Sequence, residues 1–313
     1  MNDYERALQI VAEVKKAIVG KDECIAISVA AILAGGHILL NDIPGVGKTT
    51  LASALAKTMS LKSNRVQFTP DVLPSDILGF SMYEKTTGQF VYQPGSILCN
   101  LFLADELNRT SPKTQSALLE AMEEGQVTVD GKSRQLPEPF FVIATQNPYG
   151  SAGTQMLPES QLDRFMVSMS LGYPELEDEI HILKGQHKEH TPQAVTTAQE
   201  LLHLQSLTDQ VYVHEEIYRY IGRLVHRTRN QESIDLGVSP RGAICLVKMA
   251  KALAFLRQRE FVVPQDVADM ALPVMGHRIQ ESSRARVERR SKEQLIAQIL
   301  REEKPPSLKR VHQ

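Results

Sequence analysis

Residues 44–49 read Pro44-Gly45-Val46-Gly47-Lys48-Thr49, and this short run decides the fold expected for the whole chain. It follows an apolar stretch at 37–40 and opens a helical stretch at 50–59. Glycines let the backbone curl so that its N–H groups face an anion, and the start of the next helix adds partial positive charge. Lys48 would then reach the β- and γ-phosphates of a nucleotide, and the Thr49 hydroxyl would ligate Mg²⁺. The run therefore predicts a nucleotide-binding P-loop.

One position departs from the P-loop pattern G-x-x-x-x-G-K-[ST], because Asp42 stands where the pattern has glycine. A carboxylate beside phosphates is unfavourable, so we expect the Asp42 side chain to point away from them. The turn is then left to Gly45 and Gly47.

Two further apolar runs end in polar side chains. Residues 101–106 read Leu-Phe-Leu-Ala-Asp-Glu. A strand that ends beside the P-loop would put Asp105 on the Mg²⁺ ion and Glu106 where it can polarise water. The alternative, an ordinary strand followed by exposed acids, is disfavoured by the P-loop in the same chain. The run 140–144 leads to Asn147, which could orient the attacking water, although an Asn-Pro turn would give the same pattern.

Two arginines complete the candidate site. Arg164 lies in Leu162-Asp163-Arg164-Phe165, and Arg241 lies in Ser239-Pro240-Arg241-Gly242. An arginine over the γ-phosphate accelerates its transfer by about 10³–10⁵. Taken singly, either arginine could instead be an ordinary surface residue.

The order of apolar runs predicts an α/β fold with two parts. Short runs alternate with helical stretches and predict a mainly parallel sheet covered on both faces: 37–40, 66–68, 101–104, 140–144 and 166–171. After Gly172-Tyr173-Pro174 the pattern becomes helical, and in 242–257 the apolar residues fall on one helical face. We therefore expect an αβα core at 1–172, a smaller all-helical lid at 173–304 and a short tail at 305–313.

Composition limits the function classes. The chain has 313 residues, 42% of them hydrophobic, and a net charge of −2, so no overall field draws it to nucleic acid or membrane. Its three cysteines are far apart, which fits a reducing compartment rather than a disulfide framework or zinc site. No signal-peptide segment opens the chain, and the apolar stretch 25–40 is shorter than the roughly 20 residues of a membrane span. We expect a cytoplasmic protein.

These motifs and their order resemble the AAA+ ATPases, and within them the MoxR family. The resemblance covers nearly the whole chain. It is carried by the segments 19–22, 44–49, 105–109, 115–123, 144–148, 162–165 and 239–242. It implies an αβα core with a helical lid, an insertion around 76–92 and a hairpin at 126–135. Asp130-Gly131 between alternating residues also favours the hairpin.

The resemblance implies ATP and Mg²⁺ as cofactors and gives the site residues roles. Asp105 and Thr49 would hold the metal, Glu106 would act as base and Asn147 as sensor 1. The residues that it places at the nucleotide are Val19, Gly20, Pro44, Gly45, Val46, Gly47, Lys48, Thr49 and Thr50.

The resemblance also implies partners. Arg164 would be the finger supplied to a neighbouring subunit and Arg241 would be sensor 2, which together fit a homo-oligomer, a hexameric ring in this family. MoxR-like proteins are chaperone-like ATPases that help to mature or assemble partner complexes, commonly beside proteins with von Willebrand factor A domains. The client protein is not identified by any residue.

Other functions stay open. Related AAA+ rings move nucleic acid, and Lys132, Arg134 and the basic C-terminal segment favour such a motor. The net charge, the absence of Trp and the 5% aromatic content disfavour it, and the tail's acids are interleaved with its bases. A metal-chelatase subunit is a nearer alternative. A GTP switch ranks last, because no N/T-K-x-D motif follows the P-loop at a suitable place.

Overall fold

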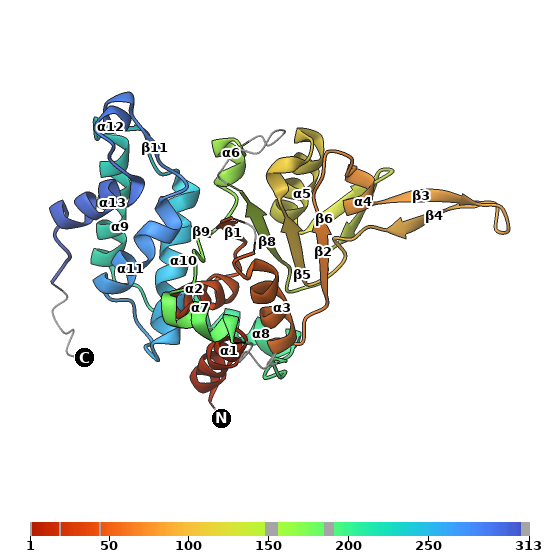
Figure 1. Cartoon of the computed structure of the whole chain (residues 1–313), viewed down its shortest axis with the longest axis horizontal. Coiled ribbons are helices and arrows are strands. Elements are labelled where there is room, and N and C mark those ends of the chain that lie inside the picture. Colours follow the sequence, from red (N-terminus) through yellow and green to blue (C-terminus); the bar gives the residue numbers. More distant parts are fainter. Residues whose placement is uncertain (1, 19, 44, 148–155, 185–190, 308–313) are drawn as a thin grey trace.

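A parallel sheet forms the centre of the first part of the chain (Figure 1). The computed structural model describes residues 2–18, 20–43, 45–147, 156–184 and 191–307. Five strands pair in the order β2-β5-β8-β1-β9, and every neighbouring pair is parallel. Their bounds are β1 Ile38–Asn41, β2 Ser63–Gln67, β5 Leu101–Asp105, β8 Phe141–Gln146 and β9 Val167–Met169. All five strands predicted from apolar runs are therefore confirmed, with ends shifted by a few residues.

Helices cover both faces of this sheet. They are α1 Asp3–Ala17, α2 Asp22–Leu33, α3 Lys48–Thr58, α4 Pro74–Leu78, α5 Pro112–Glu124 and α6 Glu159–Leu162. Alternate strand residues enter different cores: Leu101 and Leu103 pack with α1, α2 and α3, whereas Phe102 and Ala104 pack with α4 and α5. Every residue of β5 and β8 is buried, as expected for a parallel sheet covered on two sides.

The second part of the chain is mainly helical. Its helices are α7 Leu176–Leu183, α8 Ala198–Asp209, α9 Glu215–Arg229, α10 Pro240–Leu256, α11 Pro264–Met275, α12 Ser283–Val287 and α13 Lys292–Glu302. The expectation of an all-helical lid is wrong in one detail, since β10 (Ile234–Leu236) and β11 (Gln280–Glu281) form an antiparallel pair. Strands of three and two residues are too short to produce a readable alternation.

One apolar core runs through both parts. Residues of α1 and α2 share it with residues of α8, α9, α10 and α11. The helical part is thus packed against the outer helices of the first part, at the left of Figure 1. Among the helices described, none combines the length and apolar character that a bilayer crossing requires.

Two hairpins extend from the sheet's outer helices. The insertion predicted at 76–92 is the end of α4 followed by β3 (Gly79–Glu84) and β4 (Gln89–Pro94), which project from the body in Figure 1. The predicted hairpin at 126–135 forms from β6 (Gln126–Val129) and β7 (Lys132–Gln135). Both residues of its turn, Asp130 and Gly131, have positive φ, the conformation that a two-residue type I′ turn requires.

Candidate functional site

The P-loop connects the end of β1 to the start of α3. Gly45 and Gly47 have φ values of 87° and 97°, a backbone region that favours glycine. A Cβ added at either position would meet nothing within 4 Å, so the turn rather than crowding requires glycine. No side chain caps the N-terminus of α3. Its first-turn N–H groups therefore face outward beside Val46 and the exposed side chains of Thr49 and Thr50, an arrangement that suits an anion.

Lys48 is held by the backbone at the entry to the P-loop. Its ammonium nitrogen donates to the backbone carbonyls of Asp42, at 2.8 Å, and Ile43, at 2.9 Å. Burial lowers the pKa of Lys48, whereas the negative charges of Asp42, Asp105 and Glu106 act in the opposite direction and raise it. The lysine of the P-loop therefore lies within the electrostatic influence of the acidic pair at the end of β5.

Asp42 turns its carboxylate toward the segment that follows β9. Ser170 Oγ donates to Oδ1 at 2.7 Å, the Gly172 N–H donates to the same oxygen at 3.1 Å, and the Leu171 N–H donates to Oδ2 at 2.5 Å. The side chain is 4% exposed. These contacts explain how an acid can stand at the first position of a P-loop: its carboxylate binds residues 170–172 and not the loop.

Asp105 is held by two residues that the sequence motifs did not reveal. Thr145 Oγ1 donates to its Oδ1 and Arg65 Nη2 donates to its Oδ2, both at 2.7 Å. Thr145 lies on β8, two positions before the predicted Asn147, and Arg65 lies on β2. Only the register of the sheet could have revealed these two residues, because it places the ends of β2, β5 and β8 side by side.

Glu106 follows Asp105 in a left-handed conformation, with φ at 56°. This conformation is uncommon for a residue with a side chain and starts the short 3₁₀ turn Leu107–Arg109. The Glu106 N–H donates to Thr145 Oγ1 at 2.9 Å, and its Oε2 accepts from Arg109 Nη1 at 2.7 Å. Thr145 therefore links both acids of the pair.

The remaining predicted residues are placed as follows. The backbone carbonyl of Asn147 accepts from the Asn108 side chain at 3.3 Å. Gly20 has φ at 73°, and a Cβ there would overlap the Asp178 carboxylate of α7, so this glycine allows a close approach. Val19 and Pro44 lie outside the described residues.

The two predicted arginines meet at one carboxylate. Glu123, near the end of α5, accepts from Arg164 Nη1 at 2.9 Å and from Arg241 Nη2. Arg164 also donates to the Leu119 carbonyl at 2.7 Å. Both arginines thus contact α5 in the structure, whereas Lys48 Nζ is bonded to the backbone carbonyls of Asp42 and Ile43. Glu123 lies in the segment 115–123, which gave no sign of this contact.

An ion pair with a buried arginine fixes the segment that carries Arg164. Asp163 accepts from Ser239 Oγ and from Arg278 Nε, each at 2.8 Å. The Arg278 side chain is 1% exposed and donates to the carbonyls of Phe165, at 2.6 Å, and Met166, at 3.2 Å. Arg164 and Arg241 therefore lie close together, because Ser239 and Arg278 of the helical part both bind Asp163, the residue before Arg164.

The groups around the P-loop fit a magnesium nucleotide. Backbone N–H groups at a helix start and a lysine ammonium suit phosphate oxygens. The Thr49 hydroxyl and the Asp105 carboxylate are oxygen ligands, the type that Mg²⁺ prefers. The open space beside Gly45 and Gly47 leaves the backbone accessible.

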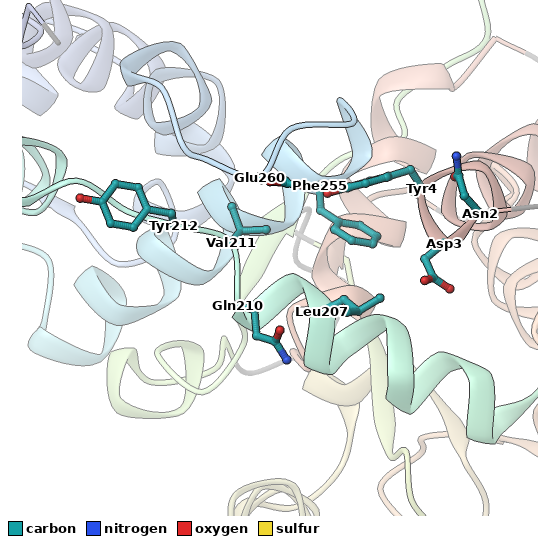
Figure 2. A pocket seen from close by; sticks show the side chains of 9 residues that line it. All are labelled: Asn2, Asp3, Tyr4, Leu207, Gln210, Val211, Tyr212, Phe255 and Glu260. Atoms are coloured by element: carbon teal, nitrogen blue, oxygen red, sulfur yellow. The ribbon is translucent and has the colours of Figure 1, made fainter. Parts of the chain in front are cut away.

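A separate cavity of about 570 Å³ lies between α1, α8 and α10 (Figure 2). The rings of Tyr4 and Phe255 face each other there, with centroids 4.7 Å apart. The other residues that line it are Asn2, Asp3, Leu207, Gln210, Val211, Tyr212 and Glu260. None of the predicted site residues lines this cavity, so the candidate site is the P-loop edge of the sheet.

Two family models match the chain. Residues 37–167 match the model described as "ATPase family associated with various cellular activities (AAA)", and residues 226–299 match the model "AAA lid domain". The first match spans β1 to β9 with the P-loop and the acidic pair. The second begins within α9 and contains Arg241.

Similar proteins cover nearly the same length. "Uncharacterized protein YeaC" of Bacillus subtilis is 46% identical over 299 residues, which is 95% of this chain and 93% of that protein. "Chaperone MoxR1" of Mycobacterium tuberculosis is 36% identical over 324 residues, covering 100% of this chain and 85% of that protein. "Protein MoxR" of Paracoccus denitrificans is 29% identical over 295 residues, covering 86% of each. The crystal structure of a Cytophaga hutchinsonii protein superposes with a TM-score of 0.90 at 37% identity and covers 97% of this chain and 96% of that one.

Proposed function

Because this chain belongs to the MoxR family of AAA+ ATPases, we propose that it hydrolyses ATP with Mg²⁺ and couples hydrolysis to the remodelling of a partner protein. The observation that carries the proposal is that Thr145 on β8 binds both Asp105 and Glu106, and that β8 lies between β5 and β1, the strand that leads into the P-loop and Lys48. A phosphate-binding lysine and an acidic pair at the same edge of one parallel sheet are the parts that phosphoryl transfer needs.

Each residue has a distinct task in the proposed reaction. Lys48 and the α3 N-terminus hold the phosphates, and Asn147 orients the attacking water. Glu106 accepts the water proton while the oxygen–phosphorus bond forms and the bond from the γ-phosphorus to the bridging oxygen breaks, giving ADP and phosphate. Thr49 and Asp105 would hold Mg²⁺, which when bound neutralises charge on the phosphates.

The two arginines support a ring in which each site is completed by a neighbour. Arg164 and Arg241 both bind Glu123, at the place where α5 meets the helical part. We propose a hexamer in which the Arg164 side chain reaches the γ-phosphate site of the adjacent protomer and Arg241 acts beside it. Stabilisation of developing charge by such groups depends on assembly, so isolated protomers would hydrolyse ATP slowly.

We further propose a division into a core at 1–172, a lid at 173–304 and a tail at 305–313, with closure about the segment near Pro174. Movement of the lid would convert contacts with phosphate into relative motion. The name of the relative "Chaperone MoxR1" supports a chaperone-like role in the maturation of a protein complex. We expect a cytoplasmic protein with a client and a von Willebrand factor A domain partner; a chelatase-type subunit is the nearest alternative.

The hairpin cation Arg134 gives no support to the nucleic-acid motor. Its guanidinium lies 3.7 Å from the ring centroid of Tyr92 and donates to the Lys132 carbonyl at 3.0 Å. A cation stacked on an aromatic ring and bonded to its own hairpin fixes one hairpin against the other. This structural role explains the arginine at position 134 without a nucleic-acid ligand.

Phosphate release by the purified chain tests the catalytic half of the proposal. We expect turnover of ATP that stops when EDTA removes divalent metal, and a loss of about 10²–10⁴ in Glu106→Gln with nucleotide binding retained. Glu232→Gln, at an 86% exposed side chain, is the matched control and should behave as wild type. ATP hydrolysis by Glu106→Gln at the wild-type rate would exclude Glu106 as the base.

Capture of a partner tests the remodelling half. Glu106→Gln loaded with ATP should retain a specific protein from a lysate of the source cells, and release it in ADP. DNA or RNA that is retained instead, or that stimulates turnover in a salt-dependent manner, would favour the motor.

A further inference from the structure

Asp42 belongs to two structural units at once. Its main chain starts the P-loop, where its carbonyl oxygen accepts from Lys48 Nζ at 2.8 Å. Its carboxylate binds the linker, which we define as residues 170–174 between β9 and the helical part. The same residue therefore contacts the lysine expected to hold the phosphates and the chain segment about which the lid is expected to move.

The carboxylate is fully engaged by the linker. Three donors reach its two oxygens: Ser170 Oγ at 2.7 Å, the Leu171 N–H at 2.5 Å and the Gly172 N–H at 3.1 Å. The residue is 4% exposed, and a charge at such a position is stable only when donors surround it. Gly172 has φ at 64°, so the linker adopts here a turn that presents consecutive N–H groups to the acid.

Two other contacts hold the linker to the first part of the chain. Cys24 Sγ donates to the Ser170 carbonyl at 3.2 Å, and Lys21 Nζ donates to the Tyr173 carbonyl at 2.7 Å. Both come from the start of α2 or the residue before it. Of the three described anchors, only Asp42 also belongs to the P-loop.

We propose that Asp42 is a positioning residue that transmits the position of the linker to Lys48, so that ATP turnover depends on where the lid lies. The proposal rests on the ATPase function proposed above. A shift of residues 170–172 moves the Asp42 carboxylate, and its carbonyl oxygen, on the same residue, moves with it. Since Lys48 Nζ is held by the carbonyls of residues 42 and 43, the shift changes how readily the lysine turns toward phosphate.

Asp42→Asn tests this role while keeping the size of the side chain. One carboxylate oxygen becomes an NH₂ group that faces the N–H of Leu171 or Gly172, so at least one hydrogen bond is lost. We expect kcat to fall by about tenfold or more while the dissociation constant of ADP, from calorimetry, changes by less than about threefold. A matched control is Asp266→Asn, which alters a 0% exposed carboxylate of α11 bound by Arg257 and Arg259 and should lower Tm without changing kcat.

Ser170→Ala provides a milder variant that leaves the P-loop sequence intact. It removes one donor to Asp42, so we expect a smaller loss of kcat in the same direction. Its effect should not add to that of Asp42→Asn, because both act through one contact. Ser168→Ala, two residues earlier on β9, removes a hydroxyl that binds Asn41 rather than Asp42 and should leave kcat unchanged.

Hydrogen exchange gives a readout that does not require turnover. In the wild-type chain, addition of ADP or of a non-hydrolysable ATP analogue should change the protection of the Leu171 and Gly172 amides. In Asp42→Asn that response should disappear. If Asp42→Asn lowers Tm but keeps both the kcat and the nucleotide response of these amides, Asp42 is structural only and the inference is wrong. If the wild-type chain binds no nucleotide, the proposed function itself fails.

Discussion

The Glu106 carboxylate is bound by Arg109, with 2.7 Å between Oε2 and Nη1. Arg109 follows Glu106 by one turn of the 3₁₀ segment after β5. The carboxylate of the proposed base is therefore paired with a residue of the same turn. The Arg109 side chain is 43% exposed and that of Glu106 is 22% exposed. An ion pair of this exposure contributes only about 0–1 kcal/mol, so it can open during turnover.

Arg109→Ala should therefore increase ATP turnover. Release of Glu106 from the pair makes the carboxylate more available to water, and the exposure of the pair limits the gain to about fivefold. Phosphate release at saturating ATP and Mg²⁺ measures the effect. Arg109→Lys keeps a cation and should fall between the variant and wild type. A loss of turnover in Arg109→Ala would instead show that Arg109 holds Glu106 in its working position.

The parts of the fold that were predictable from sequence have local signals. The glycines and lysine of the P-loop and the buried strand before it lie within a few residues of one another, so their order alone indicates strand, turn and helix. Four of the five strands were readable because each is short, largely apolar and bounded by helical stretches. The fifth, β2, reads Ser-Asn-Arg-Val-Gln, and only its last two residues fall in the predicted run 66–68. The pair β10–β11 was missed because its strands are too short to alternate.

The contacts inside the site could not be read in this way, because they depend on residues brought together by folding. Arg65 and Thr145 meet Asp105 across 40 residues in each direction. Glu123 joins Arg164 and Arg241 only because the end of α5, the segment before β9 and the start of α10 lie near one another. The roles assigned to the site residues remain predictions; the structure supplies their neighbours.

Mixed rings should show that Arg164 acts on a neighbouring protomer. Arg164→Ala alone should lose about 10³–10⁵ in turnover, and Lys48→Ala alone should also be inactive. When the two proteins are mixed and reassembled, some interfaces pair an intact Lys48 with an intact Arg164, so part of the activity returns. Phosphate release by the mixture, compared with each protein alone, measures this recovery.

The control for that experiment mixes Lys48→Ala with Glu106→Gln. Both residues belong to one protomer's site, so no assembly of these two proteins contains an intact site and activity should stay absent. If Arg164→Ala and Lys48→Ala likewise fail to restore activity although mixed rings form, Arg164 does not act in trans. The same mixture with Arg241→Ala assigns Arg241 to its own or the adjacent protomer.

Arg278→Met should destabilise the chain. The Arg278 side chain is 1% exposed, and it binds the Asp163 carboxylate and the backbone carbonyls of residues 163, 165, 166 and 274. Its loss therefore removes a cation from Asp163 and leaves buried carbonyls without this donor. We expect the free energy of unfolding to fall by about 3 kcal/mol. Urea denaturation followed by circular dichroism measures the change.

Arg284→Met is the control for this substitution, because its side chain is 67% exposed and its ion pairs are on the surface. It should cost less than about 1 kcal/mol. Equal effects of the two variants would contradict the structural importance assigned to Arg278. Because Arg278 fixes the segment that carries Arg164, Arg278→Met should also lower turnover. Full activity in this variant would show that Arg278 stabilises the fold but does not position Arg164.

His37 should make the chain less stable in mild acid. Its Nδ1 accepts from the Val142 N–H at 3.0 Å, which leaves Nε2 to donate to the Met122 carbonyl at 3.1 Å, so the neutral ring is the one that fits. Burial lowers the pKa of His37 from 6.5 to about 4. The unfolded chain takes up the proton first as pH falls, so the stabilisation is complete above about pH 6.5 and is lost progressively toward pH 4.

Chemical denaturation at pH 7 and pH 5 measures this loss. The half-buried ring should contribute about 1–2 kcal/mol to the difference in unfolding free energy between the two pH values. His37→Gln keeps a donor and an acceptor but has no proton to gain in this range, so its stability should fall less between pH 7 and pH 5 than that of wild type. Carboxylates that titrate in the same range are common to both proteins and cancel in the comparison. Identical pH dependence in the two proteins would show that His37 is accessible to protons in the folded chain and that its backbone contacts do not require the neutral ring.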